Sequence, residues 1–366
     1  MPLAPLIYLH PRLYQRLINY IVGAWTVLPS ALLENFFGVR FTVTGDEIDH
    51  SRPAVIIMNH RTRLDWLYFW SALFRINPWL LTSEKISLKG ILKYIPGAGW
   101  AMGSNAFIFL ERSFKNDSKR IDQLIEYYAK VCVNYQLLLF PEGTDKSPGT
   151  TIRSKVFAEK NNVAHYNYVL HPRVTGFVHV VQKMRKENYI DCIYDVTIAF
   201  NDSIVQTEAD LIKLGVASKD VRFDIRKIPI SELPTDDQEL GLWLKNLWVE
   251  KEERLRKFYG QSADSRQLDK LSDAKTFDLT SQNRVFQILI LLMWIILTIG
   301  WIYFFSTSNY SFLFAFITIG FYVGLQVIFH GSEMFISKIG LDEWRKRSGG
   351  DRQQPENILN GTLKHD

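Results

Sequence analysis

The chain has 366 residues, of which 47% are hydrophobic and 22% are charged, and its formal net charge is +5. These values lie near the averages of globular proteins, and without a clustered basic stripe the modest positive charge argues against nucleic-acid binding. The cysteines, Cys132 and Cys192, form neither a disulfide framework nor a metal-binding spacing. A mean hydropathy of −0.05 nevertheless averages over strongly apolar and strongly polar segments.

The first apolar segment, residues 17–33, is uncharged and contains a central Pro29. Its length is at the lower limit for a transmembrane helix, so it could cross a membrane or lie bent in the interface. No small-residue cleavage site follows it, which argues against a signal peptide. A crossing would put Arg12 and Arg16 on the far side of the membrane, and we therefore favour an in-plane or re-entrant course. Residues 1–40 are assigned to a membrane-associated N-terminal segment.

Residues 41–260 alternate between short β-prone runs and segments of helical spacing. Several of the runs are apolar throughout, as in central strands covered on both faces. The expected strands are residues 40–44, 54–58, 106–110, 136–140, 195–200 and 221–226. Helical spacing is found in residues 62–74 and 117–131. This alternation predicts an α/β domain with a mixed, mostly parallel sheet covered by helices.

An amphipathic helix is expected over residues 239–259, at the end of the α/β region. Leucine and tryptophan side chains repeat at three- and four-residue steps on one face. The charged face is supplied by Lys251, Glu252, Glu253 and Arg254. We expect this helix to pack over the sheet and to carry no site residue. A polar linker, residues 261–283, follows it.

The strongest membrane signal runs from Val285 to Phe329, where no side chain is charged. A helix needs about 20 apolar residues to cross the hydrocarbon core, so this run suffices for two crossings. A polar break at residues 306–309 divides it into spans 285–305 and 312–329. We expect a transmembrane helical hairpin over residues 284–330 and a polar tail over residues 331–366.

The sharpest local pattern is Asn59-His60 followed by Asp65, directly after the expected strand 54–58. A histidine that acts as a general base needs a carboxylate on one ring nitrogen, because this contact fixes the tautomer. From the loop before the helix, the His60 ring could fold back over the first turn and reach Asp65. A lone histidine is more often structural, and the spacing alone leaves both interpretations open.

Of three further patterns, two follow expected strands. Glu142 belongs to the turn Phe140-Pro141-Glu142-Gly143-Thr144, at the carboxyl end of a strand, where open α/β sheets bind ligands. Arg112 follows strand 106–110 and could clamp a phosphate. Pro172 marks a strand end or an edge. Taken alone, the pattern around Glu142 is better explained by an ordinary turn with a solvated glutamate. The alternative for Arg112 is a surface salt bridge with Glu111.

In this order, the four motifs resemble those of the glycerolipid acyltransferase superfamily, of the 1-acylglycerol-3-phosphate type. The stretch Pro96-Gly97-Ala98-Gly99-Trp100-Ala101-Met102 is similar to the lysocardiolipin acyltransferase branch. The resemblance implies that His60 and Asp65 are catalytic. It implies that the substrates are bound by Asn59, Arg112, Glu142, Gly143, Thr144 and Pro172. Pro172 would lie near the acyl donor, whereas Arg112 and the turn at 142–144 would surround the glycerol-phosphate part of the acceptor. No metal and no bound cofactor are implied, and acyl-CoA is the co-substrate. That branch tends to carry one more apolar segment near the amino terminus, which leaves the topology of the amino terminus and the question of a shortened form open.

The implied function is transfer of a fatty acyl chain from acyl-CoA to a lysophospholipid hydroxyl, in phospholipid synthesis and remodelling. The resemblance leaves the acceptor open among monolysocardiolipin, lysophosphatidylglycerol, lysophosphatidylinositol and lysophosphatidic acid. A CoA-independent phospholipid transacylase and an inactive lipid-binding scaffold are the alternatives. A serine hydrolase is disfavoured, because no Gly-x-Ser-x-Gly elbow is found.

The distribution of basic residues predicts the orientation. Arg284 precedes the hairpin and Lys338 follows it, whereas the hairpin loop carries no positive charge. Positive residues gather on the cytosolic side of membranes, so the α/β domain is expected there. The endoplasmic reticulum membrane is the expected location, and the mitochondria-associated membrane is the second choice.

Overall fold

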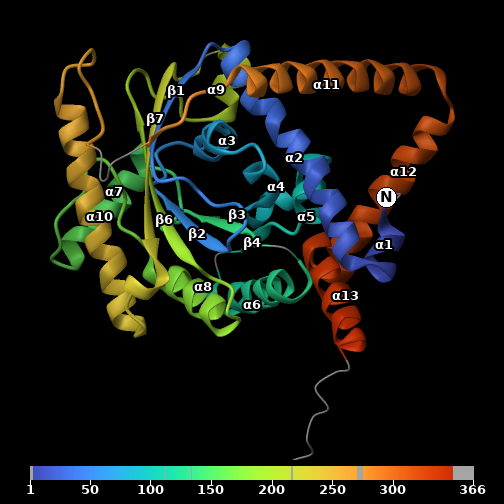
Figure 1. Cartoon of the computed structure of the whole chain (residues 1–366), viewed down its shortest axis with the longest axis horizontal. Helices are drawn as coiled ribbons and strands as arrows, with labels where there is room; N and C mark the ends of the chain where they lie inside the picture. The colour runs from blue at the N-terminus through green and yellow to red at the C-terminus, as the bar shows by residue number, and fades with distance from the viewer. Residues whose placement is uncertain (1–2, 112, 133, 216, 270–274, 349–366) are drawn as a thin grey trace, which may run out of the picture.

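A computed structural model describes residues 3–111, 113–132, 134–215, 217–269 and 275–348. In these residues, an eight-stranded sheet with the order β4-β3-β5-β2-β6-β7-β1-β8 forms the centre of the molecule (Figure 1). The strands are β1 Arg40–Gly45, β2 Ala54–Met58, β3 Glu84–Lys89, β4 Ile108–Leu110, β5 Gln136–Leu139, β6 Cys192–Phe200, β7 Asp220–Pro229 and β8 Lys275–Thr276. Neighbours from β4 to β6 run parallel, β7 is antiparallel to β6, and β1 is parallel to β7. The expected mixed, mostly parallel sheet is confirmed.

Strand β2 shows why the parallel half reads as a continuous apolar run. All of its residues are buried. Ile56 and Met58 join the hydrophobic cluster on one face of the sheet, whereas Val55 and Ile57 join the cluster on the other. Successive side chains point to opposite faces of a strand, and here helices cover both faces.

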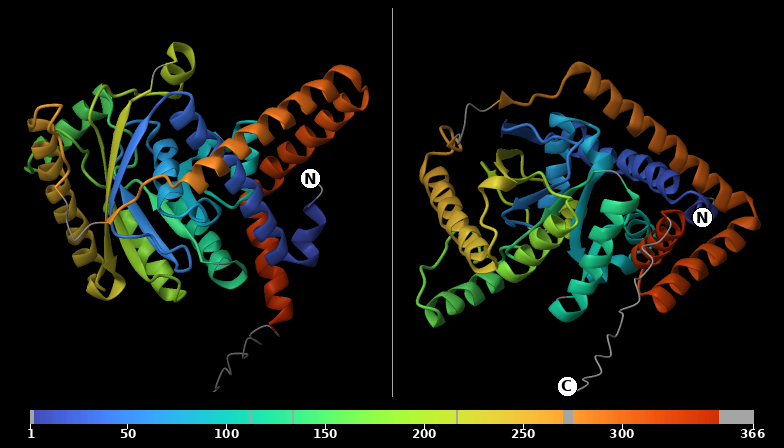
Figure 2. Two further views of the ribbon diagram at one scale, coloured as in Figure 1. Left: turned by 45° about the horizontal axis from the view of Figure 1, so that its top comes forward. Right: turned by 60° about the horizontal axis from the view of Figure 1, so that its bottom comes forward.

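Helices from both ends of the chain complete the layers. The helices are α1 Ala4–Leu9, α2 Pro11–Asn35, α3 Asp65–Ile76, α4 Leu80–Ser83, α5 Ala98–Ser104, α6 Phe114–Val131, α7 Pro148–Lys160, α8 Val174–Lys186, α9 Glu208–Leu214, α10 Asp237–Gly260, α11 Ser281–Thr307, α12 Tyr310–Phe329 and α13 Ser332–Arg347, with 3-10 turns η1 Gly90–Tyr94 and η2 Ile230–Glu232. Helices α2, α3 and α4 contribute to the cluster on one face, and α6, α8, α10 and α13 to the cluster on the other (Figures 1 and 2).

The carboxyl-terminal part is more ordered than its polarity suggested. The expected linker contains β8, which pairs with β1. The expected polar tail begins with helix α13, whose Phe335, Ile336 and Leu341 are buried against the rest of the α/β domain. The remainder of that tail, residues 349–366, lies outside the described residues.

Three helices in the described part of the chain are long and apolar enough to cross a membrane: α2, α11 and α12. The most apolar window of α11 and of α12 is only 6% buried within the protein, whereas that of α2 is 44% buried. Figure 1 and the right view of Figure 2 show that α11 and α12 diverge as an open V from the turn that joins them. Helix α2 runs unbroken past Pro29 and contacts α3, α4 and α11. Its in-plane course stays a prediction.

Candidate active site

The loop between β2 and α3 brings His60 and Asp65 together. His60 Nδ1 lies 2.9 Å from Asp65 Oδ2. Asp65 is fully buried in the first turn of α3, and it also accepts hydrogen bonds from the main-chain N–H and the hydroxyl of Thr62. The amino-terminal end of a helix favours a negative charge there. The contact between His60 and Asp65, which the sequence left open, is therefore present. The Asp65 carboxylate is held in place by both His60 and Thr62.

The His60 ring is also fixed from its face. The ring of Phe140, at the end of β5, stacks on it with a centroid distance of 4.2 Å. Nδ1 is engaged by Asp65, so Nε2 is the ring nitrogen that remains for a reacting group. This arrangement has the geometry of a histidine base with a carboxylate that orients it.

Glu142 supports the histidine loop rather than projecting into solvent. Its Oε1 accepts hydrogen bonds from the main-chain N–H of His60 at 3.1 Å and from the indole of Trp248 at 3.3 Å. Its Oε2 accepts from the N–H of Leu170 at 3.0 Å. Burial raises the pKa of Glu142 to about 8, and these donors oppose the rise. Both carboxylate oxygens are thus occupied by protein groups that hold two loops of the site together.

Gly143 and Arg173 meet beside this carboxylate. Gly143 has φ +72°, a left-handed conformation that favours glycine, and a Cβ there would lie 3.3 Å from Cδ of Arg173. The N–H of Arg173 donates to the carbonyl of Pro141 at 2.7 Å. The turn and the fourth motif therefore form one surface, with the arginine side chain across the glycine.

Asn59 occupies a different position from the one expected for a substrate-binding residue. Its side-chain amide donates to the carbonyl of Ile198 at 3.1 Å and its oxygen accepts from the N–H of Ile198 at 2.9 Å. The residue is 1% exposed and does not line the cavity. It joins the end of β2 to β6, and it acts on the site by fixing the backbone before His60.

A cavity of about 820 Å³ opens at the carboxyl ends of the parallel strands. His60, Glu142, Gly143, Thr144 and Pro172 line it, whereas Asp65 lies behind the histidine. Apolar lining comes from Leu92, Ile108, Ile121, Phe177 and Val180. The size is that of a small-molecule binding site, and the lining combines apolar surface with a few polar groups.

Basic side chains at this cavity suit an anionic ligand. Lys89, Arg153, Arg173 and Lys245 line it and are exposed. Lys89 is the last residue of β3, a strand that the sequence did not predict, and its Nζ lies 3.6 Å from Asp145 Oδ1. Arg173 directly follows Pro172 in the fourth motif. Arg112, which the resemblance assigns to the acceptor phosphate, lies outside the described residues. Within those residues, no three His, Cys, Asp or Glu side chains are grouped so as to hold a metal.

Comparison with known proteins identifies the family of this chain. Residues 40–201 match the family model described as Acyltransferase, and residues 214–294 match Acyltransferase C-terminus. Lysocardiolipin acyltransferase 1 of Gallus gallus is 46% identical over 258 residues, which cover 70% of this chain and 68% of that protein. This chain belongs to the acyltransferase family.

Two other similar proteins complete the comparison. Lysophosphatidylinositol acyltransferase 10 of Caenorhabditis elegans is 50% identical over 248 residues, which cover 68% of this acyltransferase. The match spans 63% of that relative's length. Among solved structures, the 1-acyl-sn-glycerophosphate acyltransferase PlsC of Thermotoga maritima is 15% identical, with a TM-score of 0.43. That match covers 65% of this chain and 81% of the other.

Helix α10 of the acyltransferase carries residues that hold the site, contrary to our expectation of a packing helix. Trp248 donates to Glu142, and Glu252, one turn later, accepts from the N–H groups of Asn167, Tyr168 and Val169. The loop 167–170 is therefore fixed by two carboxylates. The sequence shows only an apolar repeat at three- and four-residue steps in this helix. Such a repeat cannot distinguish a helix that positions the loops of the site from one that only packs on the sheet.

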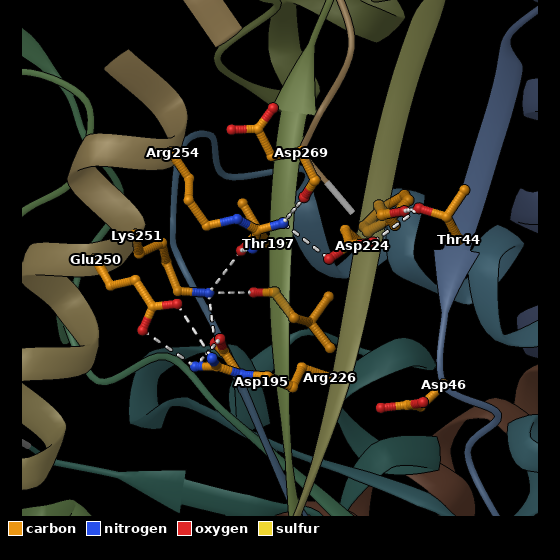
Figure 3. A network of polar contacts seen from close by, with 12 residues as sticks. Thr44, Asp46, Asp195, Thr197, Asp224, Arg226, Glu250, Lys251, Arg254 and Asp269 are labelled. Carbon is orange, nitrogen blue, oxygen red and sulfur yellow. Dashed lines mark hydrogen bonds and ion pairs between the residues drawn. The ribbon is translucent and has the colours of Figure 1, made fainter. Parts of the chain in front are cut away.

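Two of the four residues on the charged face of α10, Lys251 and Arg254, are buried. Lys251 Nζ lies 2.6 Å from Asp195 Oδ1, and Arg254 Nη2 lies 2.8 Å from Asp224 Oδ2. Figure 3 shows these two pairs reaching from α10 to strands of the sheet, with Thr197 between the two cations. Buried cations of this kind need partners. The ion pairs thus fix the position of the helix that carries Trp248 and Glu252.

Proposed function

We propose that this acyltransferase transfers a fatty acyl chain from acyl-CoA to the free hydroxyl of a lysophospholipid. The observation that carries the proposal is the His60–Asp65 pair at the wall of a partly apolar cavity. The names of the relatives, a lysocardiolipin and a lysophosphatidylinositol acyltransferase, support a lysophospholipid as the acceptor.

The chemistry follows from the position of the histidine. Asp65 holds the proton on Nδ1, so Nε2 accepts the proton of the lysolipid hydroxyl as its oxygen attacks the thioester carbonyl. A C–O bond forms and a tetrahedral intermediate results. Its collapse breaks the C–S bond, and the imidazolium returns the proton to the departing thiolate. The products are a diacyl phospholipid and free CoA, and His60 is regenerated.

The basic side chains at the cavity supply charge for the two substrates. Both a lysophospholipid and CoA carry phosphate groups, which lysine and arginine bind by charge-assisted hydrogen bonds. Lys89 and Arg173 line the cavity together with His60. We assign the acceptor phosphate to this group, with Arg112 as the further ligand that the family resemblance implies.

The proposed location is the endoplasmic reticulum membrane, with the α/β domain on the cytosolic side. Two exposed apolar helices, α11 and α12, support membrane attachment. The cytosolic side is where acyl-CoA is made available, and it agrees with the basic residues that flank the two helices.

A reconstituted assay tests this function. Purified protein in phosphatidylcholine vesicles receives radiolabelled oleoyl-CoA together with one of the four candidate lysophospholipids, and the labelled diacyl product and free thiol are both quantified. We expect one thiol for each labelled product, with at least one acceptor. A second arm supplies the label on phosphatidylcholine without acyl-CoA. Label that moves only in this second arm would replace the proposal with a transacylase, and no transfer in either arm would favour a scaffold.

A further inference from the structure

The segment after β3 exposes apolar side chains at the edge of the cavity. In and after turn η1, Ile91 is 70% exposed, Tyr94 57% and Ile95 45%. A 3-10 helix has three residues per turn, so Ile91 and Tyr94 lie on the same side of it. Ile91 and its neighbour Leu92 also line the cavity. One short turn thus presents apolar groups both to the cavity and to the surroundings of the protein.

This turn is attached to the end of α12. Lys93 Nζ donates to the carbonyl of His330 at 3.1 Å, and the side chain of Gln326 donates to the carbonyl of Lys93 at 3.4 Å. Lys93 is itself buried, so its charge is turned inward and away from the apolar surface. If α12 crosses a bilayer, its carboxyl end lies at the membrane surface, and η1 lies at the same level.

The glycine-rich stretch that marks the family resemblance strengthens this attachment. Helix α5 follows η1, and its Trp100 ring stacks on Tyr322 of α12 with a centroid distance of 4.7 Å. A Cβ at Gly99 would lie 2.3 Å from the carbonyl oxygen of Leu92, and one at Gly103 would lie 2.3 Å from Ser332 Oγ. The two glycines therefore allow α5 to fit closely between η1 and the start of α13.

We propose that the segment 91–95 is a membrane-inserted threshold of the active site. Ile91, Tyr94 and Ile95 contact the lipid bilayer where α12 leaves it, and the lysophospholipid passes over them from the bilayer into the cavity. The bilayer is favoured as the occupant because Lys93 of this segment is hydrogen-bonded to the end of α12, and the surface of α12 is apolar and exposed. An amphipathic tyrosine suits the interface between headgroups and acyl chains. The passage of a lysophospholipid rests on the proposed function, whereas the contact with the bilayer does not.

A fluorescence measurement tests the contact. Full-length Tyr94→Cys protein is labelled with an environment-sensitive fluorophore in vesicles of phosphatidylcholine and phosphatidylinositol that carry an acyl-chain doxyl quencher. Ile152→Cys on α7 is the matched control, because Ile152 is 65% exposed and α7 lies on the opposite side of the molecule from α12 (Figures 1 and 2). Labelled wild type, whose cysteines are Cys132 and Cys192, gives the background.

We expect a blue-shifted, quenched signal from position 94 and a water-like, unquenched signal from position 152. Equal exposure of the two probes to water would overturn the proposal. A probe at 94 that is shielded from water but not quenched by the lipid would indicate a protein partner, and it would overturn the proposal as well.

An activity measurement tests the passage of lipid. We expect the double variant Tyr94→Ser with Ile95→Ser to acylate a long-chain lysophospholipid in vesicles about tenfold more slowly, because two apolar side chains no longer enter the bilayer. A short-chain acceptor dissolved in water bypasses this step and should react at the rate of the Ile152→Ser control. An equal loss of rate with both acceptors would contradict the proposal that the lysophospholipid passes over segment 91–95. If wild type acylates neither acceptor, the proposed function fails, and the quenching result still decides the contact with the bilayer.

Discussion

We expect Glu252 on α10 to affect the activity of the acyltransferase, because it holds the loop 167–169, which is distant from it in the sequence. Its Oε1 accepts a hydrogen bond from the N–H of Asn167 at 2.6 Å, and its Oε2 accepts from Tyr168 and Val169 at 2.8 and 3.0 Å. The same loop leads to Pro172 at the cavity. The variant Glu252→Gln keeps the size of the side chain but replaces one acceptor oxygen by an NH₂ group.

The magnitude follows from the bonds that remain. The amide oxygen of glutamine can keep the two bonds of one carboxylate oxygen, whereas the NH₂ group cannot accept the third. A hydrogen bond to a charged group contributes about 1.5–3 kcal/mol, and a neutral one about 0.5–1.5 kcal/mol. The loop is partly exposed, so we take the lower end and expect a cost of about 1.5 kcal/mol. This corresponds to about a tenfold lower population of the ordered loop.

Hydrogen exchange and kinetics measure this effect together. We expect amide protection at residues 167–169 to fall about tenfold in Glu252→Gln, with kcat/KM for the lysophospholipid reduced by up to the same factor. Glu253→Gln is the matched control, because Glu253 pairs with Arg256 at the surface, where ion pairs contribute about 0–1 kcal/mol. If the two variants exchange and react alike, Glu252 does not position the loop.

Three further predictions concern stability. Gly143→Ala should lower the unfolding free energy by about 1–2 kcal/mol, because alanine is strained at φ +72°; thermal unfolding should separate it from Gly149→Ala, where a Cβ meets open space. Asn59→Ala should cost about 2 kcal/mol or more, since it leaves a buried N–H and a buried carbonyl of β6 unpaired; an unchanged unfolding temperature would refute that contact. Burial raises the pKa of Glu84 from 4.5 to about 8, so the folded state keeps a proton that the unfolded chain loses, and stability should fall as pH rises through this window. Glu84→Gln should flatten that fall in thermal unfolding measured across the same pH range, and an unchanged slope would show that the carboxyl does not titrate as described.

A strand could be predicted where its own residues form an apolar run, because such a run indicates burial. Strand β2 has the expected bounds, because an unbroken apolar run specifies a strand covered on both faces. Strand β3 was not expected, because it begins with Glu84 and Lys85, which are charged yet buried. Their partners are distant: Trp70 donates to Glu84, and Lys85 donates to the side-chain oxygens of Asn19 and Asn105. No local pattern shows that such partners will be present.

The contacts of the site also divide into those between residues near in the sequence and those between residues far apart. His60 and Asp65 are five residues apart, so their contact could be inferred from one loop. Trp248 and Glu252 are more than 80 residues from the groups they bond. Long-range contacts of this kind depend on how α10 is placed by its buried ion pairs, and a periodicity argument carries no such information.

The claim that His60 is the general base is tested most directly by the rate of oleoyl transfer in two variants, His60→Ala and His179→Ala. His179 is a matched control for His60, because its Nε2 also lies 2.9 Å from an aspartate, Asp122, but outside the cavity. With oleoyl-CoA and the preferred lysophospholipid, we expect His60→Ala to lose about 10²-fold or more of the rate, as for removal of a general base, and His179→Ala to match wild type. If His60→Ala transfers oleate as fast as His179→Ala, then His60 is not the base.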